Sequence, residues 1–138
     1  MMGGVGLKVL EFIERNHPID HVEETGPYLL TKLNSLRSHE IVGDVRGKGF
    51  FTGVEFVQDR ISKKPFGFKE FAKVSNMVID KSFENGLMVY PGGSTVDGFK
   101  GDHILVVPLL TTQKNEIEEI VRLLEQSITE VEQDLKAK

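Results

Sequence analysis

The chain has 138 residues, of which 39% are hydrophobic and 28% are charged, values typical of a single soluble globular domain. Its net charge of −4 argues against a nucleic-acid-binding protein, which usually carries a basic excess. The chain has no cysteine, which excludes disulfides and thiolate metal ligands and is compatible with the cytoplasm. No apolar run approaches the roughly 20 residues that cross a bilayer, so we expect no membrane partner.

Helical periodicity marks the start of the chain. Val5, Val9 and Phe12 recur at helical spacing and predict a first helix that ends near Arg15. Pro18 then prevents a simple continuation, because its ring fixes φ and removes a backbone donor.

A second helix is expected to open at Asp20, which forms a capping-box pattern with Glu23. Pro27 interrupts the pattern, so the helix either kinks there or restarts with Pro27 in its first turn. The predicted buried face of this helix consists of Val22, Gly26, Leu29, Leu33 and Leu36.

Strand-like composition replaces the helical period in the middle of the chain. One strand is expected over residues 50–57, which are rich in aromatic and β-branched side chains, and an earlier one leads to Val45. Gly47 and Gly49 allow a tight bend between the two. Gly53 predicts a bulge, or a close approach by another backbone, inside the second strand.

A third helix and two more strands follow. The helix is expected over 69–84, and Gly86 is a good stop because glycine tolerates the left-handed conformation that ends many helices. Strands are predicted over 87–90 and 103–107, with a glycine-rich loop over 91–102 between them. The inward side chains predicted for the helix are Phe71, Ala72, Val74, Val78, Ile79 and Phe83.

The last helix completes the predicted fold. Thr112 is expected to cap it, and an apolar stripe runs from Ile117 to Leu135. The order helix, helix, two strands, helix, two strands, helix predicts one α/β domain over residues 1–138, in which helices cover one face of a short sheet.

No catalytic or metal-binding motif is recognisable in the sequence. Segment 43–49 has one residue too few before its Gly-Lys pair to be a phosphate-binding loop. His17 and His21 are four residues apart, but Pro18 separates them, so we interpret both as surface histidines. His39 is expected at a solvated helix end. No lysine has neighbours that mark it as a Schiff-base lysine, and no residue is assigned as catalytic.

An ordered set of segments resembles the class III aminotransferases. Segment 42–55 (VGDVRGKGFFTGVE) closely resembles a signature of that family, and in the family a helix with an inward glycine precedes it, as Gly26 does here. Segment 86–90 matches the family's Gly-Leu pair and short strand, and segment 101–108 matches its apolar strand ending in proline. The long amphipathic helix over 112–134 closes the match.

The resemblance, which covers about residues 7–132, implies a short, mainly antiparallel sheet of the aminotransferase C-terminal small-domain type (α+β). Such enzymes use pyridoxal phosphate to move an amino group between an amine or amino acid and a keto acid or aldehyde. In the family the large domain carries the cofactor lysine, and the small domain helps to form and close the substrate pocket. We therefore expect a parent enzyme with a large domain, which is usually a homodimer, and an isolated chain that is inactive and binds no cofactor.

The resemblance also assigns roles to individual residues. Substrate-pocket candidates are Tyr90, Gly92 and Pro108. Several relatives have arginine at the position of Tyr90, where it pairs with a substrate carboxylate. The phenol of Tyr90 favours an amine, an ω-amino acid or an atypical acceptor as substrate. The alternative is that Tyr90 only packs on the sheet. The family-motif residues expected to be structural are Arg46, paired with Asp44 or a backbone carbonyl, and Gly47, Gly49 and Gly53.

Two other functions stay open on the sequence alone. The chain could be a free-standing small-molecule-binding module or a protein-interaction module of the α/β class. An accessible apolar patch would favour an interaction surface, and the helix expected over 5–13 is the first place to look for one.

Overall fold

The computed structural model describes residues 2–66, 68–94, 96–98 and 100–137. Apart from one short 3-10 helix, the order of its helices and strands is the predicted one. The elements are α1 (Met2–Asn16), α2 (Pro18–Leu33), η1 (Asn34–Ser38), β1 (Val42–Lys48), β2 (Phe51–Phe56), α3 (Phe68–Glu84), β3 (Tyr90–Gly93), β4 (Asp102–Val106) and α4 (Lys114–Lys136).

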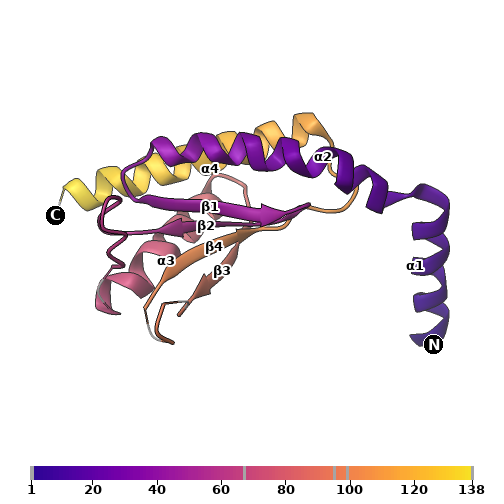
Figure 1. Ribbon diagram of the computed structural model, residues 1–138, viewed down its shortest axis with the longest axis horizontal. Coiled ribbons are helices and arrows are strands. Elements are labelled where there is room, and N and C mark those ends of the chain that lie inside the picture. Colours follow the sequence, from indigo (N-terminus) through magenta and orange to yellow (C-terminus); the bar gives the residue numbers. More distant parts are fainter. Residues whose placement is uncertain (1, 67, 95, 99, 138) are drawn as a thin grey trace.

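One antiparallel sheet with the strand order β1-β2-β4-β3 organises the molecule. Helices α2, α3 and α4 pack on one face of this sheet, and the other face carries no helix in the part of the chain that the structure describes (Figure 1). Strand alternation separates the faces: Val54 and Phe56 are buried against the helices, whereas Phe51 points to the open face. The predicted short antiparallel sheet with helices on one face is confirmed.

The hydrophobic core lies between the sheet and the three helices. The apolar stripe of α4 forms a long part of this core, as the helical period of its residues predicts. Each fully buried aliphatic side chain of this kind contributes about 1.5–3 kcal/mol to stability. The buried residues that α3 and α4 supply include Val74, Val78, Ile117, Val121, Leu124, Ile128 and Val131.

Helix α2 begins earlier than expected. Its N-cap is His17, in the left-handed conformation with φ of 47°, and the helix starts at Pro18, so Asp20 lies in the first turn rather than at the cap. Proline suits this position because the backbone donors of a first turn have no helical partner. Pro27 lies inside α2, which continues to Leu33 without a restart.

The cap of α4 is also one residue away from its predicted place. Gln113 is the N-cap, and it forms a capping box with Glu116, whose carboxylate accepts the Gln113 backbone N–H at 2.7 Å. Thr112 is buried instead, and its carbonyl oxygen lies 2.8 Å from Nε2 of His21. The carbonyl of Thr112 thus joins the start of α4 to α2.

The third strand lies further along the chain than predicted. β3 covers Tyr90–Gly93, so only the last residue of the range 87–90 is in a strand, and the expected loop supplies the rest. Pro91 is tolerated in β3 because this is an edge strand, where a missing backbone donor breaks no ladder bond.

The bulge predicted at Gly53 is absent. Gly53 pairs in regular register with Arg46 of β1 and Leu105 of β4. The irregularity of this strand pair lies in β1 instead, where the register shifts between Val42 and Asp44. The sequence therefore predicted an irregularity in the correct pair of strands, but at the wrong residue.

Some burial predictions were wrong. Phe83 is 67% exposed. His39 is not solvated, since its side chain is 11% exposed and its Nδ1 lies 3.1 Å from Oε2 of Glu132. Phe71 and Ala72 lie outside the side chains that the structure describes.

Helix α1 projects from the start of α2, away from the sheet (Figure 1). Its apolar side chains are exposed, Val5 by 65% and Phe12 by 47%, as was expected for the first helix. Among the described residues, no helix combines the length and the apolar character needed to cross a membrane.

Candidate functional site

The open face of the sheet carries an ion-pair network centred on Arg46. Nη1 of Arg46 lies 2.9 Å from Oδ2 of Asp44 and 2.9 Å from Oε2 of Glu55, so it joins β1 to β2. The hydrogen bond to Glu55, and then that to Asp44, raises the pKa of Arg46. Burial alone would raise the pKa of Asp44, but its hydrogen bond from Arg46 and the charge of Arg37 lower it. Two carboxylates thus match the charge of Arg46, which favours a structural role over anion binding.

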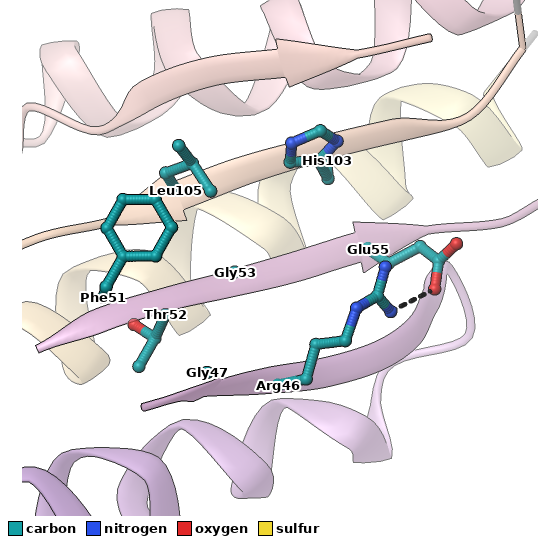
Figure 2. Close-up of a pocket in the computed structure, with 8 residues that line it drawn as sticks. All are labelled: Arg46, Gly47, Phe51, Thr52, Gly53, Glu55, His103 and Leu105. Atoms are coloured by element: carbon teal, nitrogen blue, oxygen red, sulfur yellow. Dashed lines mark hydrogen bonds and ion pairs between the residues drawn. The ribbon is translucent and has the colours of Figure 1, made fainter. Parts of the chain in front are cut away.

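A cavity of about 210 Å³ lies beside this network (Figure 2). The side chains of Arg46, Glu55 and His103 border one part of it, and those of Phe51 and Leu105 border the other. Strands β1, β2 and β4 supply these residues. The arrangement suits a small group that has one polar and one apolar end.

His103 borders this cavity next to Gly92, its partner in the sheet. A Cβ atom on Gly92 would lie 2.1 Å from Nε2 of His103, so a larger residue there would displace the ring from its present position. Partial burial, and then the charge of Arg46, lowers the pKa of His103, which keeps its imidazole neutral at pH 7.

A larger apolar groove, of about 750 Å³, lies at the end of the sheet where β1 turns into β2. Three segments line it: the first half of α2, the β1–β2 turn, and the chain that follows β4. Gly47 and Phe51 line both the groove and the smaller cavity, so the two hollows are neighbours. Apolar residues in its wall include Ile19, Val22, Leu30, Phe50, Val107 and Leu110.

The three substrate-pocket candidates lie on β3 or just beyond β4. Tyr90 opens β3 opposite Leu105, and its side chain is 67% exposed. Pro108 follows β4 and lines the apolar groove. Gly92 lies further along β3, beside His103. Tyr90 and Pro108 therefore share one end of the sheet, whereas Gly92 is further from that end.

The glycines of the family motif have different surroundings. A Cβ on Gly47 would lie 2.3 Å from the carbonyl oxygen of Phe51, and Gly49 combines a φ of 57° with a position against Val22. Both therefore require glycine for backbone geometry. Around Gly53 the nearest atom would be 3.5 Å from a Cβ, which is ordinary contact.

The described residues include side-chain types that could bind a metal ion or a carbonyl cofactor. No three His, Asp or Glu residues among them gather as metal ligands. Every lysine whose side chain is described is at least partly exposed, and hydrogen bonds with carboxylates raise the pKa of Lys32 and of Lys81. A Schiff-base lysine needs the opposite, a lowered pKa. Lys32 and Lys81 therefore do not fit a carbonyl cofactor.

Sequence reasoning missed five residues of the cavity: Phe51, Thr52, Glu55, His103 and Leu105. The available signal was alternation, because residues two apart in a strand share one face. Alternation groups Phe51 with Glu55, and His103 with Leu105, but it does not tell which face of the sheet stays uncovered.

Comparisons with known proteins give one consistent result. Residues 3–128 match the family model "Aminotransferase class-III". An uncharacterised aminotransferase of Schizosaccharomyces pombe is 38% identical over 124 residues, which are 89% of this chain and 27% of the relative. A taurine–pyruvate aminotransferase of Bilophila wadsworthia is 33% identical over 127 residues, which are 90% of this chain and 26% of the relative.

Solved structures agree with the sequence relatives. A Bacillus anthracis aminotransferase superposes with a TM-score of 0.78 at 30% identity, over 90% of this chain and 27% of that one. The chain therefore spans about a quarter of the length of the proteins it matches.

Proposed function

The chain belongs to the class-III aminotransferase family, and from this premise we propose that it acts as the C-terminal small domain of a pyridoxal-phosphate-dependent aminotransferase. One observation carries the proposal. About nine-tenths of this chain matches the relatives, but the match covers only 26–27% of the length of each relative. The remaining part of such an enzyme would bring the lysine that holds the cofactor. The lysines whose side chains the structure describes are all at least partly exposed, which supports that division of roles.

In this proposal, the end of the sheet that carries Tyr90 and Pro108 helps to form and close the substrate pocket. The exposed position of Tyr90 supports the assignment, since its phenol is available to a neighbouring group. A phenol can hydrogen-bond a polar group but lacks the paired donors with which arginine binds a carboxylate. We therefore propose an amine, an ω-amino acid or an atypical acceptor as substrate. The relative named for taurine, whose reacting group is a primary amine, supports this class.

The same proposal defines the state of the isolated chain. Without a large domain it has no transaminase activity and binds no pyridoxal phosphate. The parent enzyme is proposed to be a homodimer in the cytoplasm, a location with which the absence of cysteine is compatible.

Titration of the purified chain with pyridoxal phosphate, followed by borohydride reduction, tests the proposal. We expect no saturable aldimine absorbance and no lysine that is labelled in preference to the others. An intact class-III aminotransferase, such as the Bilophila relative, is the positive control. A single saturable adduct on one lysine would show that the chain has its own cofactor site and would refute the proposed division of roles.

A further inference from the structure

The backbone geometry of β2 does not explain the glycine at position 53. Gly53 pairs in regular register with Arg46 and Leu105, and its φ is not positive. A Cβ atom there would lie 3.5 Å from the carbonyl oxygen of Ile104 and 3.6 Å from Cδ2 of Leu105, both ordinary contacts. Glycine weakens the interior of a strand, and it often marks a bulge or a close approach by another backbone or by a ligand. Because the described residues show neither a bulge at Gly53 nor a backbone beyond the paired strands, a ligand is the reason that remains.

The missing side chain of Gly53 opens the cavity of about 210 Å³ on the open face of the sheet (Figure 2). Residues directly opposite one another in an antiparallel pair share a face, so Arg46, Gly53 and Leu105 form one row across three strands. The side chains of Arg46 and Leu105 both border the cavity, on either side of Gly53. The backbone of Gly53 therefore forms the floor between two walls.

The apolar part of the cavity has the size of an aromatic ring. Phe51, which is 64% exposed, borders this part together with Leu105. A dry cavity of about 150 Å³ holds a benzene molecule, so the volume here admits a six-membered ring with one small substituent. A flat ring can lie on the glycine floor, and the ring of Phe51 offers it an offset or edge-to-face contact.

The polar part of the cavity is electrically balanced. Asp44 and Glu55 accept hydrogen bonds from Arg46, and Asp44 also pairs with Arg37, so two cations face two carboxylates. The ring nitrogens of His103 make no hydrogen bond to another described residue. A neutral imidazole donates through one nitrogen and accepts through the other. This part of the cavity therefore offers hydrogen bonds to an uncharged polar group and no unpaired charge to an ion.

We propose that the cavity over Gly53 binds a small uncharged aromatic compound that carries one hydrogen-bonding group, such as an aryl alcohol. The ring lies on the Gly53 backbone between Phe51 and Leu105, and the hydroxyl group forms a hydrogen bond with His103. The site is open to solvent on one side, and such a ligand has only about eight non-hydrogen atoms, so we expect a dissociation constant on the order of 1 mM.

A backbone-amide NMR titration of the 138-residue chain with benzyl alcohol tests the site. We expect saturable shift changes that are largest at Phe51, Gly53 and His103. Benzoate and benzylammonium have the same ring but carry a charge. Both are expected to bind at least about fivefold more weakly, since the charges at the site are already paired.

Two pairs of variants place the ligand. Gly53→Ala puts a methyl group on the floor without a clash and is expected to weaken binding at least about tenfold. Gly6→Ala is its control, because nothing lies within 4 Å of that Cβ position in α1. Leu105→Ala removes one wall and should also weaken binding, whereas Leu109→Ala, at a side chain that is 77% exposed and does not line the cavity, should not. The amide spectrum of each free variant shows whether its fold is intact.

Three results would overturn the site: no saturable shift change, equal affinity of Gly53→Ala and the unaltered chain, or shift changes confined to the apolar groove. Tighter binding of either charged compound would overturn the uncharged class of ligand. These results bear on this site alone, because the small-domain proposal is tested by the pyridoxal phosphate titration.

Discussion

Gly26 of α2 lies so close to Gly49 of the β1–β2 turn that a Cβ atom on Gly26 would be 2.6 Å from the Cα atom of Gly49. Gly49 itself has a φ of 57°, which favours glycine. The contact lets α2 lie directly on the turn, and both residues line the apolar groove. The packing of two backbones therefore determines the shape of the groove.

Gly26→Ala is expected to lower the free energy of unfolding by about 1–3 kcal/mol, because the added methyl group meets backbone that cannot rotate away. Urea unfolding followed by circular dichroism measures the change. Gly6→Ala in α1 is the control: nothing lies within 4 Å of its Cβ position, and alanine is the better helix former by up to about 1 kcal/mol. Similar effects of the two substitutions would contradict the close contact.

Asp102 of β4 is a buried carboxylate with incomplete hydrogen bonding. Its Oδ2 accepts the backbone N–H of Ser75 at 3.0 Å, whereas its Oδ1 is buried without a hydrogen-bond partner. Desolvation raises the pKa of Asp102 to about 6, against the opposing effect of the hydrogen bonds from Ser75. Because the folded-state pKa is the higher one, this group stabilises the fold fully below pH 4, and that contribution disappears as the pH rises through 6.

Asp102→Asn removes this titration. The free energy of unfolding of the variant minus that of the wild type is expected to rise by up to about 3 kcal/mol between pH 4 and pH 7. Chemical unfolding of both proteins across this range measures the difference, in which the other carboxylates cancel. A difference that stays constant with pH would refute the raised pKa.

For Glu132 of α4 we expect stability to depend on pH in the opposite direction. It accepts the backbone N–H of Ile41 at 3.2 Å and lies 3.1 Å from Nδ1 of His39. Burial alone would raise the pKa of Glu132, but these bonds, that of His39 first, lower it overall. Its contribution is therefore present above the ordinary glutamate pKa and is lost as the pH falls through the lowered value.

Glu132→Gln is expected to destabilise the protein by about 1–3 kcal/mol at pH 7, since a buried charge-assisted hydrogen bond is replaced by a weaker one. The difference from the wild type should shrink as the pH falls through the lowered pKa of Glu132, below which both side chains are neutral. Thermal unfolding at several pH values measures it. Glu119→Gln, which removes an exposed carboxylate of the same helix, should have little effect at any pH; a matching loss there would argue against a specific role for Glu132.

Two basic side chains cover the outer edge of β1. Nη2 of Arg37 donates to the carbonyl oxygen of Val45 at 3.0 Å, and Nζ of Lys63 donates to that of Gly43. β1 is an edge strand, and unpaired edge groups promote pairing between molecules. These bonds therefore protect the edge.

Replacing Arg37 and Lys63 together by alanine is expected to increase aggregation on gentle heating, as measured by light scattering. The control replaces Lys81 and Arg122, which pair with carboxylates on exposed helix surfaces and carry the same total charge. If the control aggregates equally, the change in net charge rather than the uncovered edge is the cause.

Much of the fold could be predicted from the sequence because it depends on local periodicity. The stripe of α4 and the inward position of Gly26 in α2 follow from residues three and four apart, and the strands follow from composition. The errors were local as well: proline at the start of α2 outweighed the capping pattern at Asp20, and β3 formed where Tyr90 could pair with Leu105.

By itself, the sequence determined the family, the order of the elements and the exposure of α1. Only the tertiary structure decided which face of the sheet stays uncovered, and it thereby joined Arg46, Glu55 and His103 around one cavity. It also brought His39 to Glu132, 93 residues away, although His39 had every local sign of a solvated residue. The physical reason is that periodicity shows which residues share a face, whereas burial depends on what packs against that face from distant parts of the chain.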